Sequence, residues 1–283
     1  MFVRKALRTG LAILCLAGVS ACGTTYRMPD ISETTTSQAV AMFDAARAEP
    51  PHAMASPDVG MTRFRRVASR VEPVARKFCE KELAAGRNVD CNVQLQIDRE
   101  MKERNAYFTY AESGNRGPII RFSVPILQDA RNDDEIAFIL GHEYGHLIGQ
   151  HIQKQQQQAL AGALILGALT AYSNAQAASV GAYYDPHAVE QNMQIGAAAG
   201  QLAFSQTYEL ESDMIGTRIA AAAGYDPVKG ARFFARDEPA RSQSGKLSFW
   251  GTHPSDQKRV AVVLATMEQI RAQEGLVRKG SAN

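Results

Sequence analysis

The sequence contains few residues of the types that usually bind metals or form disulfides. Among 283 residues there are six histidines and four cysteines, and the 31 basic and 29 acidic residues leave a formal net charge of +2. So balanced a charge gives no electrostatic reason to expect a nucleic-acid partner. The apolar segment at residues 159–170 is shorter than the roughly 18 residues that suggest a membrane-spanning helix. With so few histidines, a regularly spaced histidine pair is informative.

The first 22 residues show the pattern of a bacterial lipoprotein signal. Three basic residues precede an apolar run over residues 11–19, and small residues lead up to Cys22. A signal of this kind is cleaved before the cysteine, which is then modified with lipid. The alternative is an ordinary signal peptide with an accidental cysteine. We therefore predict a signal peptide over residues 1–21 and a lipid anchor on Cys22, and cleavage would make the net charge slightly negative.

Proline separates this segment from the rest of the chain. We expect a lipidated tether over residues 22–60, with one short helix near residues 37–48, because prolines interrupt any longer element there. A catalytic domain is predicted over residues 61–275, beginning with a helix at residues 62–85, and residues 276–283 are expected to form a tail. The prolines of the tether are Pro29, Pro50, Pro51 and Pro57.

Cys79 and Cys91 are the two cysteines that remain for the folded part. Cys15 would be removed with the signal, and Cys22 would carry the lipid. An even number of cysteines in an oxidising compartment favours a disulfide. We predict a Cys79–Cys91 bridge between the first helix and the first strand; two free thiols or a pair of metal ligands are the alternatives.

Three short runs with strand-like composition follow, at residues 92–97, 106–110 and 119–124. Turn-forming residues bound them, so we predict a small antiparallel sheet beside the next helix. An edge strand of such a sheet can hold an extended peptide through main-chain hydrogen bonds. The alternative is a sheet that only covers the helix.

The strongest motif is H-E-Y-G-H at residues 142–146. Asn132 is a suitable N-cap for a helix through this motif. On a helix, His142 and His146 lie on the same face and can both bind one zinc ion. Glu143 lies next to them and can take a proton from a zinc-activated water.

His151 does not extend this motif into the metzincin pattern. That pattern needs its third histidine at position 152, which is Ile152. A shift of one residue turns a helical side chain by about 100°. We therefore expect His151 to be packed or hydrogen-bonded.

A helix at residues 159–170 and a polar loop at residues 172–185, lying over the site, should follow the motif helix.

The third zinc ligand is expected on a helix that runs from Asp185 to Ala223. A catalytic zinc needs three protein ligands and an open position. Glu209 can complete the set, and Asp213, one turn later, can accept a hydrogen bond from a ligand histidine, which we expect to be His142. Glu211 is the alternative ligand, but it has no acidic partner four residues later.

These motifs together resemble those of the metallopeptidase family of HtpX and the CAAX prenyl protease, especially its periplasmic lipoprotein branch. The resemblance rests on H-E-Y-G-H, E-L-E-S-D at residues 209–213, T-H-P at residues 252–254 and Arg259. It implies a mainly helical α+β, zincin-like fold of the gluzincin type with one zinc ion per chain. It also places His253 and Arg259 at the active site. His253 would donate to the oxyanion or occupy the open position of zinc in a resting state, with Arg259 supporting it; the alternative is that His253 caps the helix starting near Pro254.

The resemblance also implies a function and a location. The residue directly after the lipidated cysteine is Gly23 and not an aspartate. By resemblance to lipoproteins of Gram-negative bacteria, this points to the outer membrane. We expect a zinc metalloendopeptidase on the periplasmic side of the outer membrane that cleaves misfolded or unassembled envelope proteins. The alternatives are an assembly factor that works with the outer-membrane assembly machinery with little or no proteolysis, and a pseudoenzyme. The membrane-spanning helices of HtpX and the prenyl protease are absent, so their substrates do not carry over.

Overall fold

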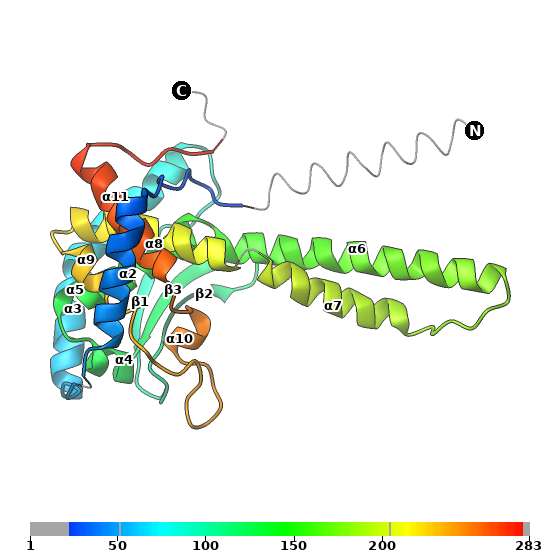
Figure 1. Ribbon diagram of the computed structural model, residues 1–283, viewed down its shortest axis with the longest axis horizontal. Helices are drawn as coiled ribbons and strands as arrows, with labels where there is room; N and C mark the ends of the chain where they lie inside the picture. The colour runs from blue at the N-terminus through cyan, green and yellow to red at the C-terminus, as the bar shows by residue number, and fades with distance from the viewer. Residues whose placement is uncertain (1–22, 51, 204, 280–283) are drawn as a thin grey trace. The chain divides into compact units, whose positions relative to one another are not determined.

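The computed structural model describes residues 23–50, 52–203 and 205–279 (Figure 1). These residues are mainly helical and include a three-stranded sheet, which confirms the predicted α+β class. The chain forms two compact units. The smaller unit contains residues 151–208 together with Gly23, and the larger contains residues 24–150 and 209–279. The signal peptide and Cys22 lie outside the described residues.

The larger unit holds the sheet and most of the helices. Its elements, in chain order, are α2 (Glu33–Arg47), α3 (Pro57–Ala84), β1 (Gln94–Asp98), β2 (Ala106–Glu112), β3 (Arg116–Ser123), α4 (Val124–Asp129), α5 (Asp133–Ile148), most of α8 (Ser205–Ala222), α9 (Pro227–Ala231), α10 (Phe249–Thr252) and α11 (Gln257–Arg271).

The sheet has the strand order β1-β3-β2 and is mixed. β2 and β3 are antiparallel, joined by a tight turn in which Gly114 and Asn115 have positive φ angles of 75° and 59°. β1 pairs with the other edge of β3 in parallel. The prediction of an antiparallel sheet is therefore wrong for β1. The turn dictates the pairing of β2 with β3, whereas the longer connection between β1 and β2 lets the chain pass the end of β3.

Residues 33–47 form a helix that belongs to the larger unit. Ser32 caps α2 by accepting a hydrogen bond from the Thr35 N–H at 3.0 Å. The prediction of a tether over residues 22–60 is therefore wrong for this segment, because burying an apolar helix face holds it against the fold. The buried side chains of this contact are Ala39, Phe43 and Ala46 on α2, Val260 and Ala261 on α11, and Ala235.

Two further boundaries differ from the prediction. α3 begins at Pro57 instead of residue 62, because Ser56 caps the helix and proline suits its first position. The described part of the predicted tail, residues 276–279, pairs with the N-terminal segment. Arg278 forms an antiparallel bridge with Tyr26, and the Arg27 N–H donates to the Val277 carbonyl at 2.8 Å.

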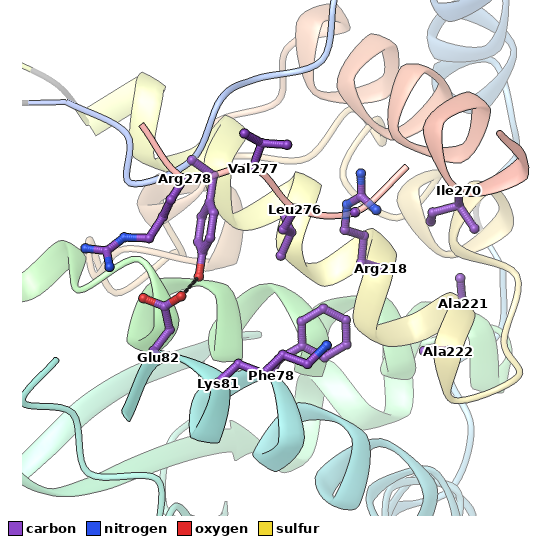
Figure 2. Close-up of a pocket in the computed structure, with 12 residues that line it drawn as sticks. Phe78, Lys81, Glu82, Arg218, Ala221, Ala222, Ile270, Leu276, Val277 and Arg278 are labelled. Carbon is purple, nitrogen blue, oxygen red and sulfur yellow. Dashed lines mark hydrogen bonds between the residues drawn. The ribbon is translucent and has the colours of Figure 1, made fainter. Parts of the chain in front are cut away.

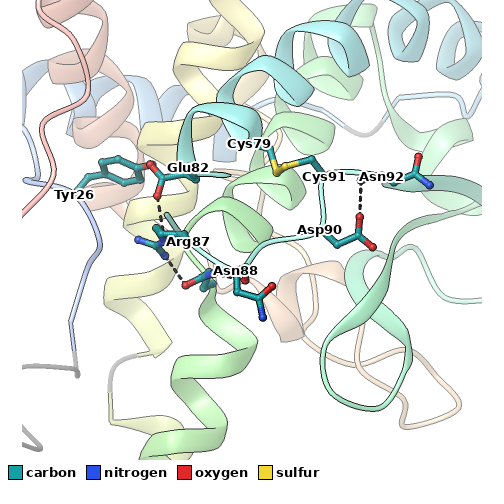
Figure 3. Close-up of a disulfide and its surroundings, with 9 residues drawn as sticks. Tyr26, Cys79, Glu82, Arg87, Asn88, Asp90, Cys91 and Asn92 are labelled. Atoms are coloured by element: carbon teal, nitrogen blue, oxygen red, sulfur yellow. Dashed lines mark hydrogen bonds and ion pairs between the residues drawn. A yellow bond between two sulfur atoms is a disulfide. The ribbon is translucent and has the colours of Figure 1, made fainter. Parts of the chain in front are cut away.

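Cys79 and Cys91 form a disulfide in the structure (Figure 3). Their Cα atoms lie 5.7 Å apart, and Cys79 is fully buried in α3. The bridge ties α3 to the segment that leads into β1. Nearby, Arg87 forms an ion pair with Glu82 at 3.2 Å, and the Tyr26 hydroxyl donates to the same carboxylate.

The smaller unit is built around a helical hairpin of α6 (His151–Ser179) and α7 (Ala188–Leu202), which run side by side (Figure 1). Glycines allow the two backbones to approach closely. A Cβ at Gly162 would lie 2.0 Å from the Gly196 carbonyl oxygen, and one at Gly200 would lie 2.1 Å from the Gln158 carbonyl oxygen. None of the described helices is both long and apolar enough to cross a membrane.

The hairpin corrects two sequence predictions. Residues 172–179, which we expected in a loop over the site, continue α6, because this alanine-rich stretch contains no proline or glycine to end the helix. The single helix predicted from Asp185 to Ala223 is two helices, α7 and α8. His151 is buried and stacks on Tyr208 at a ring-centroid distance of 4.6 Å.

Candidate metal centre

The site depends on a close approach of α5 and α8. A Cβ at Gly141 would lie 2.9 Å from the Gly216 carbonyl oxygen, and one at Gly145 would lie 2.7 Å from the Ser212 Cα. Real side chains do not tolerate such distances to backbone atoms, so glycine is required at these crossings. The sequence analysis missed this role. The glycines directly before His142 and His146 were the available signal.

Four side chains from α5, α8 and the end of α10 converge on one point. Each can offer one ligand atom so that all four atoms lie within 4.8 Å of one another. His142 Nε2 lies 3.1 Å from His146 Nε2 and 3.3 Å from Glu209 Oε2. In a tetrahedral zinc site with bonds of about 2.0–2.1 Å, neighbouring ligand atoms are roughly 3.3 Å apart. The four residues with this spacing are His142, His146, Glu209 and His253.

The chemistry of the donor set also fits a divalent cation. His142 Nδ1 lies 2.8 Å from Asp213 Oδ1, and this hydrogen bond places the proton on Nδ1 and leaves the Nε2 lone pair facing the cluster. Burial opposes ionisation of Glu209, but the imidazoles of His253 and His146 hold the pKa of its carboxyl well below the usual value. Imidazole nitrogens and an ionised carboxylate are the ligands that zinc prefers.

Glu143 lies beside the cluster and is almost completely buried. No described side chain donates a hydrogen bond to either carboxylate oxygen, and only the backbone of Phe108 lies near enough to act on the carboxyl. Burial raises the pKa of this carboxyl, and the nearby His253, with Nε2 at 3.5 Å from Glu143 Oε1, opposes the increase. A buried carboxylate with so few donors around it is costly unless it meets a ligand or water. This position suits a general base.

Asp213 and Arg259 form a buried pair behind His142. Arg259 Nε and Nη2 each donate to one oxygen of Asp213 at 2.7 Å. The guanidinium also lies over the Phe234 ring, 3.9 Å from its centroid, and 3.5 Å from Glu209 Oε2. This arrangement fixes the carboxylate that orients His142. Arg259 thus contacts the cluster through Asp213 and Glu209.

His253 belongs to the cluster. Its Nδ1 lies 2.8 Å from Glu209 Oε2 and 3.2 Å from His142 Nε2, and the residue is only 6% exposed. It does not cap the following helix, because Asp256 is the N-cap of α11. With His253 as a fourth ligand, a tetrahedral site has no open position for water. A metal held by all four side chains would therefore be in a closed site.

Residues 62–267 of the chain match the family described as Peptidase family M48. The chain belongs to peptidase family M48. Curated relatives include the mitochondrial metalloendopeptidase OMA1 of Arabidopsis thaliana, 29% identical over 149 residues, which are 50% of this chain and 26% of that protein. The beta-barrel assembly-enhancing protease of Escherichia coli (strain K12) is 27% identical over 143 residues, 50% of this chain and 28% of that protein. OMA1 of Schizosaccharomyces pombe is 28% identical over 138 residues, 48% of this chain and 37% of that protein.

Membership of this peptidase family implies a bound divalent metal. The predicted resemblance to the family of HtpX is confirmed. The chain spans 26–37% of the length of these curated relatives.

Glu211, the alternative third ligand, is not part of the cluster of His142, His146, Glu209 and His253. It is fully buried, and its Oε1 accepts the Tyr26 N–H at 2.7 Å. A pocket of about 690 Å³ lies nearby, between α3, α8 and the C-terminal segment (Figure 2). Glu82, Arg218 and Arg278 are among its lining residues, and none of the predicted zinc-site residues is among them.

Proposed function

We propose that this chain is a zinc-dependent endopeptidase that is lipid-anchored at the periplasmic face of the bacterial outer membrane, where it cleaves misfolded or unassembled envelope proteins. The convergence of His142, His146 and Glu209, with Glu143 beside them, carries the catalytic part of the proposal. The printed name of the Escherichia coli relative, a beta-barrel assembly-enhancing protease, supports the envelope part.

His142, His146 and Glu209 would hold zinc, with Asp213 and Arg259 fixing their orientation. When bound, zinc supplies Lewis-acid polarisation of the peptide carbonyl and lowers the pKa of water. Glu143 takes the proton of the attacking water and delivers it to the leaving nitrogen. His253 must leave the cluster before a substrate can enter, and from a position close by it can donate to the developing oxyanion.

The free edge of strand β2 favours an extended, unfolded polypeptide as the substrate. Among the described residues, β2 pairs with β3 alone, so its other edge is open to an added strand. β2 packs against α5, the helix that carries Glu143. A peptide added at this edge would bind through main-chain hydrogen bonds and need little specific sequence. That mode of binding suits unassembled proteins of varied sequence.

The test is a Glu143→Gln variant, which keeps the shape of the side chain but removes the base. We expect this variant to retain its metal and to lose peptide cleavage by roughly 10²–10⁴-fold. The substrate is an unfolded outer-membrane protein, and metal content is measured in the same samples. Glu80→Gln, at an exposed position of α3, is the matched control and should behave like the unchanged chain. Native-rate cleavage by Glu143→Gln would refute the assignment.

A second candidate function is an assembly factor for outer-membrane proteins. The closed cluster with His253 favours it, because a chain in this state can bind polypeptides without cleaving them. Expression of Glu143→Gln in cells separates the two functions. Rescue of envelope defects by the variant supports the assembly factor. Trapped, uncleaved polypeptides without rescue support the peptidase.

A further inference from the structure

The outer face of α6 is apolar over several turns. Every residue of this helix that is exposed between Leu160 and Tyr172 is leucine, isoleucine, alanine or tyrosine. The largest of these side chains are 57–67% exposed. They are Leu160, Leu164, Ile165, Leu169 and Tyr172. A soluble protein rarely leaves so continuous an apolar surface without a partner.

The opposite side of α6 packs against α7. Gly162 and Gly167 face Gly196 and Met193 of α7, so this side forms the seam of the hairpin. Thr170 accepts a hydrogen bond from the Asn192 amide at 2.9 Å on the same side. The apolar face therefore points away from α7, and within the smaller unit nothing in the described residues covers it.

Beyond Tyr172 the exposed residues of α6 are serine, alanine and glutamine, and the turn after the helix again exposes large apolar side chains. Val180 is 78% exposed and Tyr183 is 91% exposed. No charged residue and no histidine lies between Lys154 and Asp185. The exposed polar residues at the two ends of this face, Gln156, Gln157, Ser173 and Gln176, carry no charge. A face without any charge, ending in exposed tyrosines, is suited to the boundary between lipid headgroups and acyl chains.

The N-terminal end of the described chain is held at the base of the same hairpin. Lys154, in the first turn of α6, donates from Nζ to the Gly23 carbonyl oxygen at 2.8 Å. Gly23 follows Cys22, the residue expected to carry lipid. Because only one peptide bond separates them, an anchor on Cys22 would keep the start of α6 close to the bilayer. This link favours lipid over a second copy of the chain as the occupant of the face.

We propose that the outer face of α6 and the turn that follows it dock on the surface of a lipid bilayer. The hairpin does not cross the membrane: α6 lies along the interface with Leu164 and Leu169 in the acyl region. No lysine or arginine is present on this face, so docking does not require anionic lipids and does not weaken at high salt. The proposal takes from the proposed function only the lipid anchor, and its test does not use peptidase activity.

The test places a fluorescent reporter on this face of the full chain. A Tyr172→Trp variant is reconstituted into phosphatidylcholine vesicles whose acyl chains carry bromine, which quenches tryptophan on contact. We expect the emission of this tryptophan to shift to shorter wavelength and to lose most of its intensity. Trp250 is 3% exposed in the larger unit and serves as an internal reference that the bromine leaves unchanged. A Gln191→Trp variant, on the exposed side of α7, is the matched control and should not be quenched.

Three results would overturn the proposal. The first is that the tryptophan introduced at position 172 keeps the emission wavelength of a water-exposed tryptophan. The second is a shift to shorter wavelength without bromine quenching, which would mean that a second copy or another polypeptide covers the face. The third is quenching that needs anionic lipid and disappears at high salt. A Leu164→Ser/Leu169→Ser variant completes the design: it should reduce quenching in the Tyr172→Trp background and leave cleavage of a soluble unfolded protein unchanged.

Discussion

Asp213 gives the sharpest prediction, because its one carboxylate should affect both the folding stability and the metal affinity of the chain. It accepts a hydrogen bond from His142 and two from Arg259, and all three residues are buried. In an Asp213→Asn variant the amide has one oxygen left to accept with, and its NH₂ group cannot pair with a guanidinium. Either His142 or Arg259 therefore loses its partner.

The two losses differ in magnitude and in the property that they affect. Removing one member of a buried ion pair costs about 3–5 kcal/mol of folding free energy, because the other charge stays buried without a partner. Loss of a carboxylate that orients a metal-bound histidine lowers metal affinity by roughly 10–100-fold. We expect both effects in Asp213→Asn. Urea unfolding of the metal-free chain measures the first, and competition with a chelator measures the second.

A second substitution separates the two effects. Arg259→Met in the Asp213→Asn background removes the unpaired charge and keeps an apolar side chain over Phe234. The double variant should regain most of the lost unfolding free energy but keep the weakened metal affinity. If stability and metal affinity recover together, or if neither changes in Asp213→Asn, the assigned role of this carboxylate is wrong.

Four further predictions follow from the fold. Gly145→Ala should cost about 1–3 kcal/mol by overpacking against Ser212 and should weaken metal binding, as measured by urea unfolding and chelator titration. Cys91→Ser should lower the unfolding free energy by about 3 kcal/mol because it opens a short loop in the unfolded chain, with little change in cleavage rate. Removal of the metal by a chelator should lower the thermal midpoint, and zinc should restore it in a concentration-dependent way. Burial, and then Glu82, raise the pKa of Tyr26, so the unfolded chain loses this proton first and stability should fall as pH rises above about 10; Tyr26→Phe should flatten that decline in unfolding curves.

Three of these expectations have a clear contradicting result. Unchanged metal affinity in Gly145→Ala would mean that the helix crossing does not set the ligand spacing. A thermal midpoint that ignores both chelator and zinc would mean that the cluster does not bind a cation. An alkaline decline that is the same in Tyr26→Phe would assign the decline to other groups.

The sequence by itself determined the parts of the site that depend on local geometry. His142 and His146 are four residues apart on one helix, so their shared face follows from the helical repeat. Glu209 and Asp213 are related in the same way. The disulfide predicted between Cys79 and Cys91 also spans a short stretch of chain, and the structure forms it.

Only the tertiary structure decided how these local pieces meet. Glu211 bonds to Tyr26, far away in the sequence, and no local pattern around Glu211 indicates that partner. The parallel pairing of β1, the packing of α2 on α11 and the full length of α6 were likewise missed. Helical spacing repeats over a few residues and can be read from them, whereas the partner of a buried carboxylate, a strand or a helix face depends on the path of the whole chain.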